Sequence, residues 1–547
     1  MARTAHIDTF GRDNLPPASL LPELIFDLPE LQYPERLNCV VELLDKAVAR
    51  GDGNRVAIRF QEGQWTYQGL LERVDRIASI LIDKKGLQPG NRVLLRGAND
   101  PMMAACWLAV VKAGLIVVAT TPLLRAKELK QAIEKAQISA ALCDEKLAEE
   151  LQLTQAQTPT LRQVIYFNSA APDSLESEMG RVAGQRFVPC DTAADDVCLI
   201  AFTSGTSGAP KGTMHFHRDV LAICDCFPRS TLRADKDDVF CGTPPLGFTF
   251  GLGGMLLFPL RFGASTVLIG RLNPDSLLEA IQHFRATICF TVPTFYRQMA
   301  PLVSKYDVSS LQRCVSAGEA LPVATRDLWQ KATGLTMIDG IGSTEMLHIF
   351  ISSSNGDIRP GATGKVIPGY KACILDREGN PLPAGSAGGL AVKGPTGCRY
   401  LADERQKNYV EQGWNITGDA FLMDADGYFW YQGRTDDMII TSGYNVASSE
   451  VEECLLQHHA VMECGVVGVP DETRTEIIKA FIVLKDGYEP GDALVRQLQE
   501  HVRQTIAPYK YPRAIEFCTA LPRTETGKLQ RFKLRESAAS TLNTAVP

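Results

Sequence analysis

A run of ten residues, Thr203 to Gly212, holds side chains and backbone that could surround a triphosphate. Its sequence, TSGTSGAPKG, combines hydroxyl side chains, glycines and one lysine. Glycine lets the backbone approach phosphate oxygens and adopt positive φ. The freed N–H groups and the hydroxyls can donate hydrogen bonds, and Lys211 adds a mobile positive charge. Because glycine follows Lys211 where a P-loop has serine or threonine, the spacing predicts ATP chemistry of another kind.

The neighbours of this run indicate how it is positioned. Residues 197–202 have the pattern of a buried strand, and residues 219–223 open a helical pattern. We therefore expect a strand, a loop and a helix in succession, as parallel-sheet proteins use to present phosphate-binding groups. The alternative is a flexible Gly/Ser linker, which is disfavoured because linkers rarely lie between a buried strand and a helix.

Four more motifs could complete a nucleotide site. They are residues 339–345 (DGIGSTE), 417–419 (TGD), 433–434 (GR) and 522–528 (PRTETGK). Glycines bring backbone close to a flat ligand, and Glu345 offers a hard oxygen for Mg²⁺. Asp419 can accept hydrogen bonds from ribose hydroxyls. Each motif alone is more often an ordinary turn or surface pair, but together, in this order, they favour one site.

Composition bounds the class of protein. A chain of 547 residues is expected to form two or more domains. The net charge of −7 argues against a general nucleic-acid binder. The fifteen cysteines include no CxxC pair, which favours reduced thiols. The start of the chain lacks the apolar core of a signal peptide, and the most apolar stretch, residues 255–262, is too short to span a bilayer. We expect a cytoplasmic enzyme.

The alternation of apolar segments predicts an α/β fold. Expected strands lie at 92–96, 115–119, 140–143, 265–269 and 287–292, and expected helices at 101–113, 127–136 and 274–284. This pattern is typical of parallel sheets covered by helices. Residues 362–431 suggest a small β-rich subdomain. Beyond a break at 433–437, helices at 449–457 and 492–506 and strands at 461–469 and 477–484 predict a small α+β domain.

With these motifs the chain resembles the adenylate-forming superfamily of acyl- and aryl-CoA synthetases, luciferases and peptide-synthetase adenylation domains. The resemblance covers nearly the whole chain and rests on the five motifs together with residues 317–319 (AGE) and 442–444 (SGY). Residues 316–322, 340–348 and 509–513 are most similar to benzoate-CoA ligases. Residues 8–10, 13–17 and 214–219 are most similar to 2-aminobenzoate-CoA ligases.

The resemblance implies a two-step reaction of an aryl carboxylic acid, ATP and coenzyme A. The carboxylate attacks the α-phosphorus of MgATP to give aryl-AMP and pyrophosphate, and the CoA thiolate then expels AMP. The charge that develops on phosphoryl oxygens needs positioned positive groups. The residues implied for ATP and AMP are Thr203, Ser204, Gly205, Thr206, Ser207, Gly208, Lys211, Gly318, Glu319, Ala320, Asp339, Gly340, Ile341, Gly342, Thr344, Asp419, Arg434 and Lys528.

The resemblance implies four catalytic residues, three of them from this set together with Glu345. Lys211 would hold the β- and γ-phosphates, Thr344 the α-phosphate, Glu345 the Mg²⁺, and Lys528 would bridge the carboxylate and the α-phosphate. The resemblance also implies an N-terminal adenylation domain, 1–435, and a mobile C-terminal domain, 436–547. The latter would turn about Asp436. Its rotation would remove Lys528 and bring the CoA-binding residues to the pantetheine arm, namely Ser442, Gly443 and Tyr444.

The acid pocket implied by the resemblance is flat and aromatic. Its residues are Phe248, Thr249, Phe250, Ala317, Gly318, Gly342, His348 and Ile349. Benzoate ligases usually have Ala-Tyr where this chain has Thr249-Phe250, which disfavours plain benzoate. An ortho-amino group could donate to Thr249 or His348, which favours 2-aminobenzoate. The alternative for His348 is a core histidine bonded to the backbone, and His215 and His217 are interpreted as structural or pocket-rim residues.

Other functions stay open at this point. A free-standing adenylation enzyme that loads an aryl acid onto a carrier protein would share most motifs. A luciferase-like oxygenase would share the first step. A catalytically inactive binding module is disfavoured because Lys211, Glu345, Asp419, Arg434 and Lys528 are all present. We expect small-molecule partners with no nucleic acid and no membrane, and a homodimer is left open.

Overall fold

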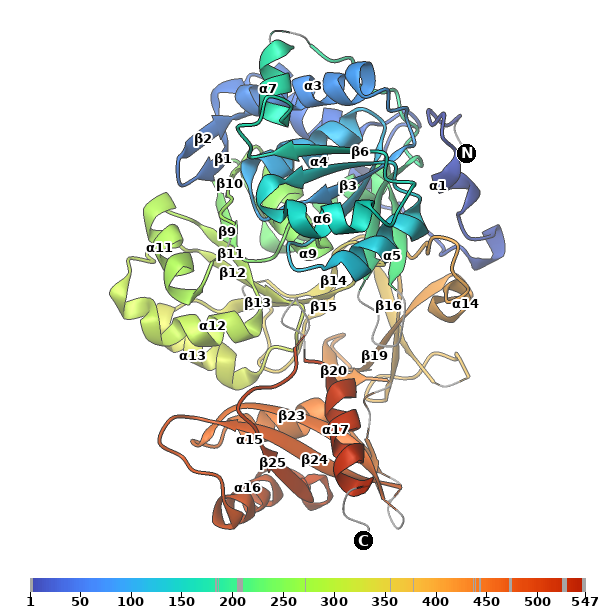
Figure 1. Ribbon diagram of the computed structural model, residues 1–547. Helices are drawn as coiled ribbons and strands as arrows, with labels where there is room; N and C mark the ends of the chain where they lie inside the picture. Colours follow the sequence, from blue (N-terminus) through green and yellow to red (C-terminus); the bar gives the residue numbers. More distant parts are fainter. Residues whose placement is uncertain are drawn as a thin grey trace.

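The computed structural model has two unequal parts (Figure 1). It describes residues 3–182, 184, 186–203, 210–270, 272–354, 356–376, 378–435, 437, 439–441, 444–471, 475–523 and 529–543. Three sheets form the large part and a fourth sheet forms the small part. No helix among these residues has both the length and the apolar composition needed to cross a membrane.

The first sheet has six strands in the order β6-β5-β3-β4-β7-β8. Their bounds are β3 Arg92–Arg96, β4 Ile116–Thr120, β5 Ala140–Asp144, β6 Gln163–Phe167, β7 Val197–Thr203 and β8 Lys211–Phe216. All neighbours are parallel except β7 and β8. Helix α4 (Pro101–Lys112) begins with Asp100 as its cap and with proline in the first turn, and all its residues are buried. It leads from β3 to β4, and α5 (Ala126–Ala136) leads from β4 to β5.

The expected strand–loop–helix around the glycine-rich run is wrong in one respect. Lys211 begins strand β8, which runs antiparallel to β7, and helix α8 (His217–Phe227) starts only after it. Residues 213–216 are β-branched, long or aromatic, types that fit a pleated surface. They pair with the otherwise open edge of β7, so the run joins two strands of a hairpin.

The second sheet has nine strands in the order β15-β14-β13-β12-β11-β9-β10-β1-β2. Their bounds are β1 Val56–Phe60, β2 Gly63–Thr66, β9 Val239–Gly242, β10 Ser265–Val267, β11 Ile288–Thr291, β12 Arg313–Ala317, β13 Met337–Gly342, β14 Ile349–Ser352 and β15 Lys365–Val366. The strands from β1 to β13 along the sheet are parallel, and antiparallel strands close both ends.

Helices on the second sheet cover a core of their own. They are α11 (Pro274–Phe284), α12 (Pro293–Met299) and α13 (Val323–Thr333), which lie together beside the sheet in Figure 1. Tyr296 and Trp329 meet edge to face there, with ring centroids 4.9 Å apart. The predicted helix at 274–284 is confirmed. It starts where the Asn273 side chain accepts a hydrogen bond from the Ser276 amide.

The third sheet is antiparallel and confirms the β-rich subdomain. It consists of β16 Lys371–Leu375, β17 Ala387–Lys393, β18 Val410–Glu411, β19 Trp414–Met423 and β20 Phe429–Arg434. A short helix, α14 (Gln406–Tyr409), precedes β18.

The fourth sheet forms a separate C-terminal domain with its own core. Its elements are β21 Ile439–Thr441, β22 Tyr444–Val446, β23 Val461–Asp471, β24 Thr475–Leu484, β25 Ala514–Phe517, α15 Ser448–Leu456, α16 Asp492–Thr505 and α17 Arg531–Asn543. The α/β fold class is confirmed. The domain boundary at 435/436 stays a prediction because residue 436 lies outside the described residues.

Candidate functional site

Two of the sequence motifs end on neighbouring parallel strands. In the second sheet Ala317 of β12 is the partner of Gly340 in β13, so residues 317–320 and 340–345 leave the same edge. A β-carbon on Gly342 would lie 2.5 Å from the carbonyl oxygen of His348. Only glycine therefore allows this close approach of the two chain segments. The strands thus bring the implied adenine and α-phosphate residues together.

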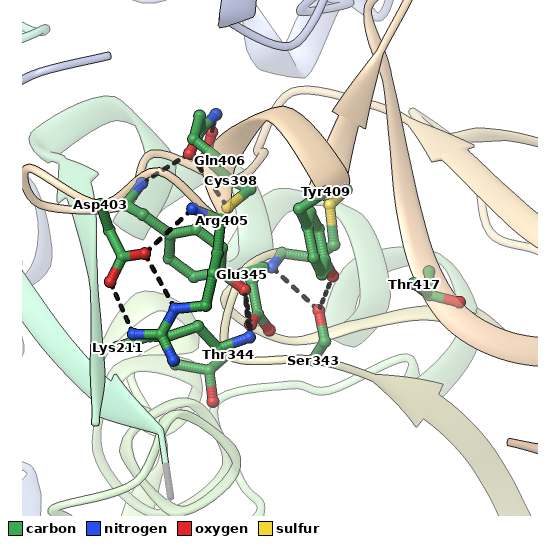
Figure 2. A network of polar contacts seen from close by, with 12 residues as sticks. Lys211, Ser343, Thr344, Glu345, Cys398, Asp403, Arg405, Gln406, Tyr409 and Thr417 are labelled. Atoms are coloured by element: carbon green, nitrogen blue, oxygen red, sulfur yellow. Dashed lines mark hydrogen bonds and ion pairs between the residues drawn. The ribbon is translucent and has the colours of Figure 1, made fainter. Parts of the chain in front are cut away.

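Lys211 and Glu345 lie close to each other (Figure 2), and a third residue, Tyr400, connects them by hydrogen bonds. Lys211 Nζ donates to the Tyr400 hydroxyl at 2.8 Å, and this hydroxyl donates to Glu345 Oε1 at 2.5 Å. The ammonium also lies 4.7 Å from the centre of the Tyr400 ring. Lys211 and Glu345 are themselves 3.9 Å apart. The implied phosphate and Mg²⁺ groups are therefore neighbours, although 134 positions separate them in the sequence.

The backbone carbonyl of Thr344 contacts a buried network of polar side chains, His215, Asp219 and Arg399. His215 Nε2 donates to the Thr344 carbonyl at 2.9 Å, and His215 Nδ1 lies 3.9 Å from Asp219 Oδ2. Arg399 donates to the same Asp219 oxygen at 2.7 Å. Burial would raise the pKa of Asp219, but Arg399 and His215 lower it to about 2. This contact agrees with the interpretation of His215 as a structural residue, here one that supports Thr344, the residue implied for the α-phosphate.

Asp419 and Arg434 face each other across β19 and β20. Arg434 Nη1 donates to Asp419 Oδ1 at 3.0 Å and to the Thr417 carbonyl at 3.1 Å. Gly418 has φ +75°, and a β-carbon there would lie 2.7 Å from Arg434 Nη2. The TGD motif thus needs glycine to let the guanidinium lie over it. These contacts place both implied ribose residues on one sheet edge.

The implied adenine residues include two carboxyl groups in different surroundings. Glu319 accepts hydrogen bonds from Thr294 at 2.9 Å and from Arg523 of the C-terminal domain at 3.2 Å. Asp339 is buried, and its Oδ1 has no hydrogen-bond partner among the described residues. Burial raises the pKa of Asp339 to about 7, although Arg326 acts in the opposite direction. The Gly340 amide lies within reach of the carboxyl group, so Oδ1 is the oxygen that the described residues leave without a donor.

His348 lies in an aromatic cage. Its ring centroid is 4.5 Å from that of Phe258, 5.7 Å from Phe250 and 5.9 Å from Phe227. Only 3% of the residue is exposed, and burial lowers its pKa to about 3. The Phe250 backbone approaches the ring, but neither ring nitrogen makes a hydrogen bond of normal geometry with a described residue. The alternative of a core histidine bonded to the backbone stays open, because the Phe250 backbone lies next to the buried ring.

The other implied pocket residues surround the same region. Thr249 begins helix α9 (Thr249–Leu252), directly after Phe248. Ala317 ends β12, and Ile349 begins β14 with its side chain over Gly340. A β-carbon on Gly253 would lie 2.4 Å from His348 Cδ2, so this glycine makes room for the imidazole. Gly253 could not be predicted from the sequence, because a Gly-Gly pair in an apolar helix does not indicate that His348, 95 positions later, packs against it.

Several predicted site residues lie outside the described residues. These are Ser204, Gly205, Thr206, Ser207, Gly208, Asp436, Ser442, Gly443 and Lys528. Thr203, which ends β7, is the partner of Lys211, and Tyr444 begins β22. Near the predicted hinge, Asp437 accepts from Arg535 of α17 at 2.7 Å. Arg523 and Leu529 form an isolated antiparallel bridge outside the named strands.

Other features lie apart from these motifs. All fifteen cysteines are free thiols. Cys39, Cys198 and His217 are buried with possible metal-binding atoms within 4.8 Å of one another. However, His217 Nδ1 already accepts the Cys39 amide at 3.2 Å, so a packing role explains this cluster. Two surface hollows, one beside Arg59 and one beside Trp65, include none of the predicted site residues.

Family models match most of the chain. The model described as AMP-binding enzyme matches residues 44–400, and the model of the AMP-binding enzyme C-terminal domain matches residues 450–528. The chain belongs to the AMP-binding enzyme family. One relative is similar to this chain over nearly the whole length of both proteins. The benzoate–CoA ligase of Thauera aromatica is 37% identical over 515 residues, which cover 93% of this chain and 98% of that protein.

Solved structures of AMP-binding enzymes agree with the fold. The anthranilate CoA ligase AuaEII in complex with anthranoyl-AMP has a TM-score of 0.88 at 34% identity, covering 95% of this chain and 100% of that chain. A benzoate CoA ligase from Burkholderia xenovorans LB400 has a TM-score of 0.83 at 31% identity, covering 91% and 100%. The protein is an ATP-binding, AMP-forming CoA ligase that acts through an acyl or aryl adenylate.

Proposed function

We propose that this AMP-forming ligase acts on 2-aminobenzoate and forms 2-aminobenzoyl-CoA. In the first step a carboxylate oxygen bonds to the α-phosphorus of ATP and pyrophosphate leaves. In the second step the sulfur of the CoA thiolate bonds to the acyl carbon and AMP leaves. The thiol proton is lost to solvent. The similarity of the chain to a benzoate–CoA ligase and to an anthranilate CoA ligase supports an aromatic acid.

The observation that carries the choice of acid is His348. With its pKa near 3 the imidazole stays neutral, so one ring nitrogen is an acceptor and the other a donor. Its polar atoms are buried among phenylalanine rings without a hydrogen bond of normal geometry. Leaving such groups unpaired is costly, on the order of 1–3 kcal/mol each. An amino group next to the carboxylate would donate to the acceptor nitrogen, and the flat ring would stack in the cage.

The ATP side of the site is proposed from the contacts described above. Glu345 Oε1 accepts from Tyr400 and lies 3.9 Å from Lys211, and a carboxylate oxygen is a ligand that hard cations such as Mg²⁺ prefer. Bound Mg²⁺ would neutralise charge on the phosphates of ATP. Lys211 and Thr203 would bind the β- and γ-phosphates, Thr344 the α-phosphate, and Asp419 with Arg434 the ribose. Gly318 to Ala320 and Asp339 to Ile341 would frame the adenine.

The C-terminal domain is proposed to alternate between the two steps. Lys528 would serve the first step, and the Ser442–Tyr444 loop would bind the pantetheine arm of CoA in the second. The boundary would lie at residues 435/436, with Asp436 as the hinge. The contact of Arg523 with Glu319, five positions before Lys528, supports a placement of that end of the domain beside the ATP motifs.

A panel of acids tests the proposal. Purified protein is given MgATP, CoA and one of 2-aminobenzoate, benzoate, 2-hydroxybenzoate or a medium-chain fatty acid, and acyl-CoA and AMP are quantified. The highest kcat/KM should be for 2-aminobenzoate. A higher value for benzoate or a fatty acid would overturn the assignment. Release of AMP that needs a carrier protein instead of free CoA would favour the carrier-loading alternative.

A further inference from the structure

Tyr400 is placed beside Lys211 by backbone pairing. In the segment between β17 and α14, Tyr400 forms a bridge with Thr213 of β8, and Leu401 N donates to the Gly212 carbonyl at 2.8 Å. Tyr400 N itself donates to Gln406 Oε1 at 2.8 Å. Backbone bonds on both sides therefore determine where the phenol lies. Its hydroxyl reaches the catalytic groups as a consequence of this pairing.

The Tyr400 hydroxyl has a defined direction of hydrogen bonding. Only 1% of the residue is exposed. A carboxylate oxygen accepts hydrogen bonds and an ammonium group donates them, so the two partners set the direction of the hydroxyl proton. That proton is donated to Glu345 Oε1, and a lone pair accepts from Lys211 Nζ. The order is therefore ammonium, then phenol, then carboxylate.

This order keeps two opposite charges close without a tight direct ion pair. Lys211 and Glu345 are 3.9 Å apart, at the edge of salt-bridge distance, because the hydroxyl lies between them. A direct pair would satisfy each charge with the other. Both groups would then have to be separated before they could bind a phosphate and a cation, which costs free energy during substrate binding. The bridge avoids that cost.

We propose that Tyr400 is a positioning residue for MgATP, which holds Lys211 and Glu345 apart and oriented for the phosphates and the cation. The proposal rests on the roles of Lys211 and Glu345 in the proposed function. We therefore expect loss of the Tyr400 hydroxyl to affect the adenylation step alone. The thioester step begins after pyrophosphate has left, so it does not use these two groups.

The test compares Tyr400→Phe with Tyr409→Phe. The first variant keeps the ring beneath the ammonium and removes only the hydroxyl. Tyr409 is a matched control, because it is also buried, its ring packs edge to face on Tyr400 at 5.7 Å, and its hydroxyl meets Ser343 at 3.2 Å. Measurements are the Kd of MgATP without acid, acid-dependent pyrophosphate exchange, and CoA thioester formation from synthetic 2-aminobenzoyl-AMP.

For Tyr400→Phe the expected result is a Kd for MgATP that rises about tenfold, since one charge-linked hydrogen bond is lost. Pyrophosphate exchange should fall at least as much, while thioester formation stays within twofold of wild type. Tyr409→Phe should leave the Kd of MgATP within twofold. The rise in melting temperature on adding MgATP gives the same comparison even for a variant that is less stable.

Three results would overturn the proposal: an unchanged MgATP affinity in Tyr400→Phe, an equal loss in both half-reactions, or the same loss in Tyr409→Phe. A cycle with Glu345→Gln adds a further check, since the effect of Tyr400→Phe should shrink in that background. The MgATP measurement needs no acid. It therefore judges Tyr400 even if wild-type protein adenylates no aromatic acid, which is the result that would defeat the proposed function instead.

Discussion

Arg434 and Asp419 are paired in register across two antiparallel strands, with Arg434 Nη1 3.0 Å from Asp419 Oδ1. The strand pairing holds the two residues opposite each other, so the sheet sets the geometry of the pair. Arg434 also donates to the Thr417 carbonyl, which leaves the carboxylate of Asp419 oriented along the sheet edge. A site whose donors and acceptors are already in place binds with less loss of side-chain freedom.

We predict that Asp419→Ala raises the KM for ATP roughly five- to 150-fold, since ~1–3 kcal/mol is expected for a lost polar partner. Arg434→Lys should also weaken ATP binding, because lysine cannot reproduce the two contacts of the planar guanidinium. Initial rates at saturating acid and CoA measure both. Arg359→Lys, which alters an exposed pair with Asp426 on the same subdomain, is the control and should leave the KM unchanged.

Substitution of His348 should change which acid is preferred more than the rate of the first step itself. We expect His348→Phe to lower the ratio of kcat/KM for 2-aminobenzoate over benzoate by roughly five- to 150-fold, because the amino group loses its acceptor. The neutral imidazole also predicts that this ratio in wild type is flat between pH 5.5 and 8.5. A ratio that is unchanged in the variant would remove His348 from acid recognition.

Loss of Lys528 should separate the two half-reactions. In Lys528→Ala, pyrophosphate exchange should fall by roughly a hundredfold or more, while thioester formation from supplied 2-aminobenzoyl-AMP persists. Lys533→Ala, a change in the following helix, is a charge-matched control. Equal losses in both steps of Lys528→Ala would refute a role confined to adenylation.

Asp339 should make the stability of the protein depend on pH. Its pKa rises from 3.8 to about 7 on folding, so between these values the folded chain holds a proton that the unfolded chain has lost. The contribution of Asp339 to the free energy of unfolding therefore falls as pH rises through this interval, by no more than about 4 kcal/mol. Urea unfolding at pH 5.0 and 7.5 measures it. Asp339→Asn should reduce the difference, and an identical difference would contradict the burial argument.

How much of this could be predicted from the sequence depends on where each residue's partners lie. Strand β3 and helix α11 were predicted to within a residue, because their own periodicity and caps determine them. The three-residue strands β21 and β22 and the terminal helix α17 were missed, since such short or weakly patterned segments form only through tertiary pairing.

The same distinction holds in the site. The glycine-bearing motifs were recognisable because they need glycine locally. Tyr400 was missed because nothing around it signals that its partners are Lys211 and Glu345, 189 and 55 positions away. The aromatic cage of His348 likewise comes from residues 227–258, which lie 90 to 121 positions before it in the chain. Motif reading therefore found the groups proposed to touch ATP, and packing supplied the groups that hold them.

Arg523 links the two parts of the molecule by sharing one guanidinium between Glu319 of the large part and Glu463 of β23, at 3.2 and 3.0 Å. Its side chain is partly exposed, so dissolved ions can screen both contacts. The apolar cores on either side are insensitive to such screening. Raising the ionic strength should therefore weaken this contact between the domains, and the salt content of an assay buffer becomes a variable in any measurement of the proposed rotation.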